Sequence, residues 1–334
     1  YVLPKTKLRA LLLRAFEVKG PSLQQMLANA SLKWISAFLT ISQFRHVTES
    51  NLTGPQDLLK GCPTLLEEQG TSEKAMQIVS DRFSGIYAAK FPRSTHIIMY
   101  VHGGGFVSGS PEGVAGWLLQ LIVELHARGI LADVFCVRYN LAPEHPFPGG
   151  LRQVVAAYEE LVSREGKPII LAGESAGSNL CLDLLRHLVD PHPEIPPVKG
   201  GNRGGRIVAA CLTCPWVDLR NESESMHRNA KYDCLEKKVL DKWREAYLGG
   251  LQPNDNWTSP VDFPGDWRDI LPPHVLLVAG GLELFLSDIL RLADKIRKVL
   301  TSRQCSIFAL LAASNTIFIL GRADTRALIY ALSL

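Results

Sequence analysis

Short apolar runs alternate with amphipathic segments along most of this chain. The apolar runs predict β-strands at residues 96–101, 133–139, 168–172, 207–214 and 274–279. Between them, apolar residues recur at helical spacing and predict α-helices at residues 113–127, 151–164, 177–189 and 287–300. Strands and helices that alternate in this way build a mostly parallel sheet flanked by helices, so the pattern predicts an α/β protein.

Three other stretches do not follow this alternation. Residues 1–75 carry helical apolar spacing around 8–18 and 23–39, whereas residues 219–270 are polar and rich in Trp, Tyr, Asn and Pro. Residues 304–321 carry no charge over 18 positions, which is the shortest length worth considering as a membrane span. Their Ser, Asn and Thr content, and a position where the sheet needs a last strand, favour a buried strand and a loop instead.

The size and composition of the chain fit one globular unit. Its 334 residues are 46% hydrophobic, enough for a large core, and α/β sheets of this length often form a single domain. The net charge is +3 with scattered Lys and Arg, which argues against a nucleic-acid partner. Most of the seven cysteines lie within apolar runs, so we expect buried thiols. Cys211 and Cys214 form a lone C-x-x-C, which is a poor candidate for a zinc or redox site.

A Gly-x-Ser-x-Gly turn follows the apolar run 168–172. It reads Gly173-Glu174-Ser175-Ala176-Gly177, and a helical stretch comes directly after it. A serine on a sharp strand-to-helix turn presents its hydroxyl, and the flanking glycines let neighbouring backbone pass close by. The N-terminus of the helix carries free N–H groups and partial positive charge, which favours an anion near Ser175. The pattern therefore predicts a serine nucleophile.

A glycine-rich loop follows the apolar run 96–101. It reads His102-Gly103-Gly104-Gly105-Phe106 and exposes backbone N–H groups with no side chain in the way. We expect Gly104 and Gly105 to donate hydrogen bonds to an oxyanion, with a third from the N–H of Ala176. A flexible turn or a phosphate loop is the alternative, but neither Gly-Lys-Ser/Thr nor Gly-x-Gly-x-x-Gly follows.

Together these motifs resemble the hormone-sensitive-lipase-like branch of the α/β-hydrolases. The resemblance rests on His102–Phe106, on Tyr139–Pro148 (Tyr-Asn-Leu-Ala-Pro-Glu-His-Pro-Phe-Pro) and on the turn around Ser175, and it covers residues 76–300. The segments Pro215-Trp216-Val217-Asp218-Leu219 and Ala279-Gly280-Gly281-Leu282-Glu283 are most similar to fungal members, including steryl acetyl hydrolases. The resemblance implies an esterase, lipase or deacetylase that acts on small or lipophilic esters without a cofactor or a metal.

The same resemblance implies how the chain is divided. Residues 76–334 would form the α/β-hydrolase domain, with an insertion at about 219–270. Residues 1–75 would form a helical region, and this region and the insertion would together cap the pocket.

A catalytic acid should follow the nucleophile in the order Ser, Asp/Glu, His. Glu283 lies just past the apolar run 274–279, at the carboxyl end of a predicted strand, and matches the fungal pattern. Asp288, in the first turn of the next predicted helix, is the alternative. We therefore predict Glu283 as the acid.

Other polar residues of the motifs have scaffold roles in this interpretation. We expect Asp218 and Glu144 to be hydrogen-bonding residues of the scaffold, and His102 and His145 to shape their loops.

The general base is missing from the sequence. The chain has nine histidines, and none of them follows Glu283. The resemblance places the base in a loop beyond the last strand, where this chain reads Ser314-Asn315-Thr316. Asn315 stands at the expected position, and an amide cannot take up the serine proton. His274 precedes its strand and would lie at the wrong end of the sheet.

Three explanations of the missing histidine remain open. The sequence after about Arg303 could carry a reading-frame or splice fault in a true esterase. The chain could instead be an impaired hydrolase that binds a lipophilic ligand, as plant gibberellin receptors of this family do. A third, weaker explanation is that water or another side chain replaces the histidine.

Partners and compartment are less defined than the chemistry. Lys5, Lys7, Arg9 and Arg14 interleave with Leu and Phe, which suits either a membrane surface or, by slight preference, a packed cap helix. The chain begins at Tyr1 rather than methionine, which is compatible with an upstream signal or anchor. Glycosylation sequons begin at Asn29, Asn51, Asn221 and Asn256, so both a cytoplasmic and an endoplasmic-reticulum or membrane-associated location stay open.

Overall fold

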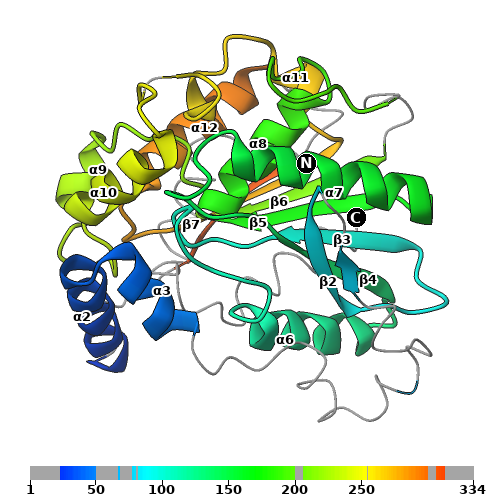
Figure 1. Ribbon diagram of the computed structural model, residues 1–334, viewed down its shortest axis with the longest axis horizontal. Coiled ribbons are helices and arrows are strands. Elements are labelled where there is room, and N and C mark those ends of the chain that lie inside the picture. The colour runs from blue at the N-terminus through cyan, green and yellow to red at the C-terminus, as the bar shows by residue number, and fades with distance from the viewer. Residues whose placement is uncertain are drawn as a thin grey trace, which may run out of the picture.

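The computed structural model describes residues 23–49, 67, 77–79, 82–199, 206–253, 255–299 and 306–312. Within these residues one sheet has eight strands in the order β1-β2-β4-β3-β5-β6-β7-β8. Figure 1 labels the strands β2 to β7 of this sheet. The strands are β1 Gln77–Val79, β2 Ser84–Ala89, β3 His96–Val101, β4 Ala132–Arg138, β5 Ile169–Glu174, β6 Ile207–Thr213, β7 His274–Gly280 and β8 Ser306–Ala312. The strands from β4 to β8 in this order are parallel, whereas β2 is antiparallel to both of its neighbours.

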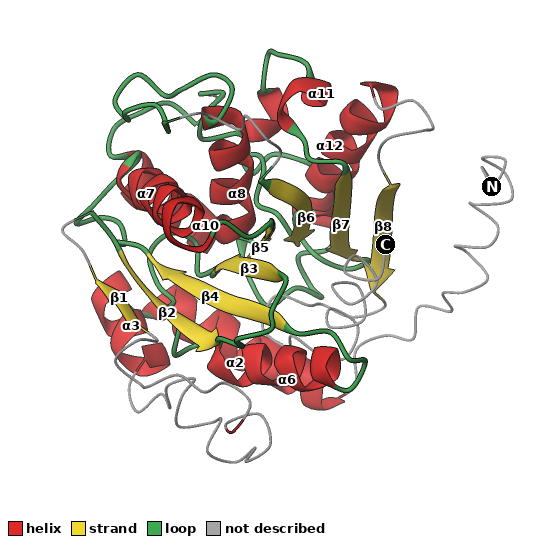
Figure 2. Cartoon of the chain, turned by 90° about the vertical axis from the view of Figure 1, so that its right-hand side faces the viewer, coloured by secondary structure: helices red, strands yellow, loops and turns green. Residues whose placement is uncertain are grey.

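Helices cover both faces of this sheet. They are α6 Ala115–His126, α7 Gly149–Glu165, α8 Ala176–His187 and α12 Leu286–Val299. In Figure 2, α6 lies on one side of the strands and α7, α8 and α12 lie on the other. The strand β3 shows why both faces need cover, because Ile97 and Met99 join the core under α7 and α8, whereas Ile98 and Tyr100 join the core against α6. Parallel strands buried on two faces read as continuous apolar runs.

Among the described residues, five helices and one 3-10 turn belong to the two segments outside the strand–helix alternation. Helices α2 Leu23–Phe38 and α3 Ile41–Glu49 precede the sheet, and α9 Glu224–Arg228, α10 Lys237–Leu248, the 3-10 turn η2 Pro260–Asp262 and α11 Trp267–Ile270 follow β6. Helices α2, α3, α9 and α10 lie side by side at one end of the molecule (Figure 1). Lys242 of α10 donates a hydrogen bond of 2.7 Å to the carbonyl of Leu39, which joins the two segments.

The predicted strands and helices are confirmed, with small shifts at their ends. The largest strand shift is in β5, which extends through Gly173 and Glu174 because these residues pair with Leu212 and Thr213 of β6. The uncharged run 304–321 begins with the expected strand β8, and its remainder lies outside the described residues. The stretch 8–18 also lies outside them. No helix in the described ranges is long and apolar enough to cross a membrane.

Gly177 sets how closely α8 approaches the sheet. A Cβ atom at this position would lie 2.1 Å from the carbonyl oxygen of Val101 and 2.5 Å from that of His102. These atoms belong to the backbone at the end of β3, so no side-chain movement relieves the clash. The first turn of α8 therefore rests directly on the end of β3.

This contact makes Gly177→Ala strongly destabilising. We expect the free energy of unfolding to fall by ~3 kcal/mol or more, since overpacking against rigid backbone forces a shift of whole elements. Gly116→Ala in α6 is the matched control, because nothing lies within 4 Å of its added Cβ. It should be neutral or stabilising by up to ~1 kcal/mol. Urea unfolding of both variants measures the difference, and equal values would contradict the close contact.

Candidate active site

Ser175 stands between β5 and α8 in a strained backbone conformation. Its φ is 51° and its ψ is −117°, values that a residue with a side chain rarely adopts. Three backbone hydrogen bonds hold it there: its N–H donates to the carbonyl of Thr213 at 2.9 Å, and its own carbonyl accepts from the N–H groups of Trp216 and Asn179, each at 3.2 Å. Such strain persists only where the surroundings fix it, and it gathers at functional sites. Ser175 retains 4% of its surface exposed.

The glycine loop after β3 lies directly beside this serine. A Cβ atom on Gly103 would lie 3.4 Å from the Cβ of Ser175, so the two motifs are in contact. Gly104 and Gly105 have φ values of 111° and 62°, and the N–H groups of Val107 and Ser108 both donate to the carbonyl of Gly104. The predicted oxyanion donors Gly104, Gly105 and Ala176 therefore belong to two backbone segments that meet at Ser175.

Helix α3 holds the outer side of this loop. Arg45 donates hydrogen bonds to the carbonyls of Val107 and Ala142 and pairs with both carboxylate oxygens of Glu144, at 3.0 and 2.9 Å. Glu49, one turn further along α3, accepts a 2.8 Å bond from the N–H of Gly109. Glu144 therefore has the scaffold role predicted for it. The roles of Arg45 and Glu49 were not predicted, because they depend on contacts between distant parts of the chain.

His102 packs between the glycine loop and Tyr139 as a neutral ring. It is buried, its Nδ1 lies 2.8 Å from the carbonyl of Gly103, and it stacks on Tyr139 at 4.3 Å. The hydroxyl of Tyr139 donates to the backbone carbonyl of His102 at 3.0 Å. Burial lowers the pKa of His102 to about 4. This environment agrees with a loop-shaping role.

Glu283 lies in a tight turn that follows β7. Its side chain is fully buried, and its Oε2 accepts a 2.7 Å hydrogen bond from the N–H of Gly280. Asn229 donates to its backbone carbonyl at 2.8 Å. Because β3, β5 and β7 are parallel, the glycine loop, Ser175 and Glu283 all follow strands at the same edge of the sheet.

The alternative acid, Asp288, lies in the first turn of α12. It is buried, and burial raises its pKa to about 6. Its Oδ1 lies 3.6 Å from Arg291, which also pairs with Asp218. Asp218 in turn binds Arg220 through two contacts of 2.7 Å, so the predicted scaffold role of Asp218 fits this ion-pair network. The preference for Glu283 over Asp288 stays a prediction.

The expected base position, Asn315, lies outside the described residues. His274 begins β7 and pairs with Ala209 and Ser306, so it lies at the edge of the sheet opposite Ser175, as expected. In the part of the chain that the structure describes, no hydrogen bond joins a histidine ring to Ser175. The structure therefore brings Ser175 and the glycine loop into contact, while the catalytic roles of Ser175 and Glu283 stay predictions.

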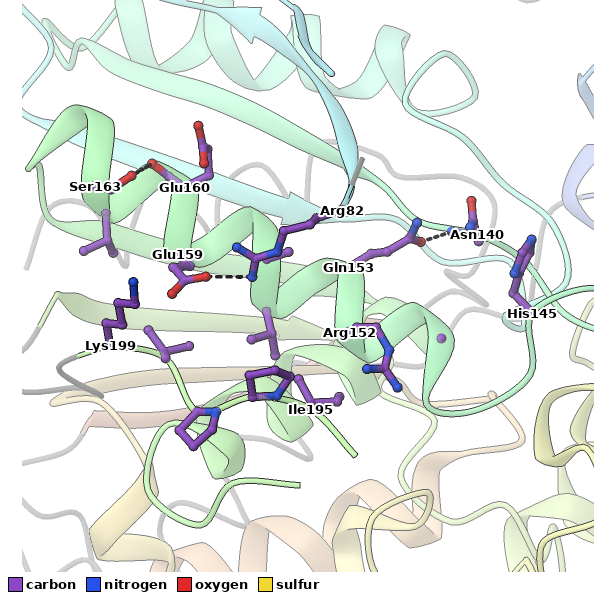
Figure 3. Close-up of a pocket in the computed structure, with 17 residues that line it drawn as sticks. Arg82, Asn140, His145, Arg152, Gln153, Glu159, Glu160, Ser163, Ile195 and Lys199 are labelled. Atoms are coloured by element: carbon purple, nitrogen blue, oxygen red, sulfur yellow. Dashed lines mark hydrogen bonds and ion pairs between the residues drawn. The ribbon is translucent and has the colours of Figure 1, made fainter. Parts of the chain in front are cut away.

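Two cavities among the described residues lie away from Ser175. The larger, of about 1030 Å³, runs along α7 and the segment 195–199. Figure 3 shows Arg82 and Glu159 paired among its lining residues, with nitrogen and oxygen 2.6 Å apart. The second, of about 590 Å³, is lined by residues at the starts of the parallel strands, including His274. Ser175 lines neither cavity.

No cluster of three or more His, Cys, Asp or Glu side chains suited to a metal ion occurs among the described residues. Five of the seven cysteines, Cys136, Cys181, Cys211, Cys214 and Cys234, are buried free thiols, as expected.

The contacts of Arg45 predict a stability difference between two ion pairs. Arg45→Met should lower the free energy of unfolding by about 1–3 kcal/mol, because it leaves two backbone carbonyls and Glu144 without their charged donor. Arg82→Met is the matched control, since Arg82 binds Glu159 at the surface with 55% of its own side chain exposed. That pair should contribute less than about 1 kcal/mol. Urea unfolding that gives equal losses would show that α3 does not hold the loop.

The low pKa of His102 predicts a loss of stability in mild acid. Between its unfolded pKa of 6.5 and its folded pKa of about 4, the unfolded chain takes up a proton that the folded chain refuses. The contribution of His102 to the free energy of unfolding should therefore fall by about 3 kcal/mol from pH 7 to pH 4, since one pKa unit is about 1.4 kcal/mol, whereas the raised pKa of Asp288 acts in the opposite direction.

His187 and His192 change stability in the same direction, because burial lowers the pKa of each. Urea titrations of the parent and of His102→Phe isolate the contribution of His102. An unchanged pH dependence in His102→Phe would refute the assignment.

The chain matches known hydrolases in sequence and in fold. A family model described as the alpha/beta hydrolase fold matches residues 98–309. An esterase of Acinetobacter venetianus is 34% identical over 206 residues, which are 60% of this chain and 61% of that protein. The hormone-sensitive lipase of Mus musculus is 38% identical over 176 residues, covering 50% of this chain and 21% of the lipase.

A solved esterase from the bacterial hormone-sensitive lipase family aligns with a TM-score of 0.67 at 23% identity, covering 93% of this chain and 97% of that one. This likeness shows the fold. The chain spans about three fifths of the length of curated relatives such as the Acinetobacter esterase. The family match covers more than half of the chain, and its extent agrees with the sheet described above. The chain therefore belongs to the α/β-hydrolase family, in the branch that includes the hormone-sensitive lipases.

Proposed function

We propose that this chain is a serine-type carboxylic ester hydrolase that acts on small or lipophilic esters. One observation carries the proposal: the strained Ser175 turn lies in contact with the Gly103–Gly105 backbone, with 3.4 Å between the Cβ of Ser175 and the position of a Cβ on Gly103. A nucleophile beside a row of backbone N–H groups is the arrangement that acyl transfer needs. Relatives named esterase and acetyl-hydrolase support the same class.

In this proposal Ser175 attacks the acyl carbon of the ester. The bond to the alcohol oxygen breaks, the alcohol leaves with a proton, and water then releases the acid from the serine ester. The N–H groups of Gly104, Gly105 and Ala176 hold the negative oxygen that forms during each attack. Glu283 would orient the base. The partial positive charge at the N-terminus of α8 would further stabilise the negative oxygen.

Aromatic side chains next to the site support a lipophilic substrate. Trp243 of α10 is buried against Gly105, where its ring carbon lies 2.3 Å from the position of an added Cβ. Phe106 stacks on Tyr247 at 3.6 Å and lies 5.6 Å from Trp216. These buried rings make the surroundings of the glycine loop apolar, which suits a lipophilic acyl or alcohol group bound beside it. Acetylated sterols or lipids are the substrates that the fungal resemblance suggests.

The contacts of α3 and α10 support the proposed cap. Phe44 of α3 lies 5.4 Å from Trp243 of α10, and both helices border the glycine loop. These helices come from residues 1–75 and 219–270, the two segments assigned to the cap. Residues 76–334 would then supply the catalytic domain.

The second candidate is an impaired hydrolase that binds a lipophilic ligand. It is favoured by the sequence, because no histidine follows Glu283 and Asn315 stands where the base is expected. A serine hydrolase without its base typically keeps only about 10³- to 10⁴-fold catalysis over water. The chain is then a slow esterase. The oxyanion donors and the aromatic side chains beside Gly105 would instead serve to bind the ligand.

Hydrolysis of a short-chain p-nitrophenyl ester separates the two candidates. We compare the unmodified chain with Ser175→Ala, Asn315→His and the double variant. If Asn315 occupies the base position, Asn315→His gains at least ~10²-fold, because a positioned acid–base group supplies that much. The double variant must lose this gain, since the new base has no nucleophile to activate.

Three results would revise the proposal. Normal turnover of the unmodified chain, abolished by Ser175→Ala, would refute the impaired-hydrolase candidate. Failure of Asn315→His to gain activity would show that the base position is misplaced. Turnover that survives Ser175→Ala would remove Ser175 as the nucleophile.

A further inference from the structure

Helix α2 turns a row of large apolar side chains away from the protein. The exposed fractions are 72% for Leu23, 55% for Met26, 61% for Leu27, 61% for Trp34 and 70% for Phe38. These five residues, called the α2 face below, recur at steps of three, four and seven positions, so they share one side of the helix. Trp34 and Phe38 contact each other with ring centroids 5.3 Å apart.

The opposite side of α2 attaches the helix to the rest of the molecule. Asn29 donates a 2.9 Å hydrogen bond to the carbonyl of Tyr232, and Lys33 donates to the carbonyl of Ala230. Ser36 is buried, and Leu32 and Ile35 pack against the core. A surface helix normally buries its most apolar side and exposes its charges. In α2 the side with the largest apolar residues is the exposed one.

Charge along this part of the chain points to one kind of partner. Lys33 is the sole charged residue between Leu23 and Phe38, and its ammonium group is engaged with Ala230. The 22 residues that precede α2 in the sequence carry Lys5, Lys7, Arg9, Arg14 and Lys19 against the single acid Glu17. An uncharged apolar face that continues from a basic segment matches a lipid surface with anionic headgroups.

We propose that the α2 face binds the interfacial layer of an anionic lipid surface. The apolar side chains lie among the outer acyl segments, and Trp34 and Phe38 lie at headgroup depth, where aromatic rings are favoured. Val47 of the neighbouring helix α3 is a further exposed apolar side chain, with 51% of its surface accessible. Helices α2, α3 and α10 lie together at one end of the molecule (Figure 1), so a lipid-bound α2 brings this end to the surface. The proposal does not depend on catalysis.

Flotation of the full chain with vesicles of phosphatidylcholine and phosphatidylserine tests the proposal. The unmodified chain should float with the vesicles. The variant Trp34→Ser/Phe38→Ser should partition at least ~10-fold more weakly, because even partial burial of two such rings provides more than about 1.4 kcal/mol. The control is Val123→Ser/Leu290→Ser, which removes apolar residues that are 40% and 41% exposed on α6 and α12. The control should bind like the parent.

The substituted residues are exposed, so the variants should keep the circular dichroism spectrum of the parent. Failure of the unmodified chain to float overturns the proposal, as does equal binding by the parent and Trp34→Ser/Phe38→Ser. Light scattering without lipid gives a further test. A dimeric parent and a monomeric Trp34→Ser/Phe38→Ser variant would show that the α2 face binds a second copy of the chain instead. Vesicle binding and ester hydrolysis are measured separately, so either proposal can fail while the other stands.

Discussion

The contact between the first turn of α8 and the end of β3 determines the geometry of the whole site. Only hydrogen fits at Gly177 beside the carbonyls of Val101 and His102, so helix and strand meet at backbone distance. This closeness forces the chain through a sharp turn at Ser175 and brings the glycine loop against it. Ser175, the proposed nucleophile, and the predicted oxyanion donors are thus brought together by this packing contact.

A second layer of contacts comes from residues far away in sequence. Arg45 and Glu49 of α3 bind backbone groups of the loop that follows β3. Trp243 of α10 lies against Gly105 of the same loop. The loop is therefore held by two helices that are not part of the strand–helix alternation, so its conformation depends on segments outside that core.

The sequence predicted the parallel part of the sheet well, and the reason is physical. Strands such as β3 are buried on both faces, so they appear as unbroken apolar runs bounded by glycine. The antiparallel strand β2 was missed because Ser84–Ala89 combines a serine, a glycine and a tyrosine in a short run without that signature. Asp133 shows a further limit of predicting strands from apolar runs alone. Its carboxylate lies within β4, where it accepts hydrogen bonds from the N–H of Phe91 and from the ammonium group of Lys167.

The parts of the candidate site that could be predicted are those encoded by short sequence motifs. The Ser175 turn and the glycine loop are each encoded within a few residues, so their positions follow from the strands that precede them. The roles of Arg45 and of the α2 face are not encoded in this way. Arg45 reaches partners 62 and 97 residues away, and the direction of the α2 face is decided by which side Asn29 and Lys33 attach.

The backbone at Ser175 also bears on whether this chain has kept its ancestral chemistry. A left-handed conformation costs a residue with a side chain about 1–3 kcal/mol, whereas glycine adopts it freely. The surroundings impose φ = 51° whether or not a reaction takes place. For a chain without any use for the hydroxyl, glycine would be the more stable residue at this position. Serine is therefore less stable than glycine at this position, and a function of the hydroxyl group would explain its presence.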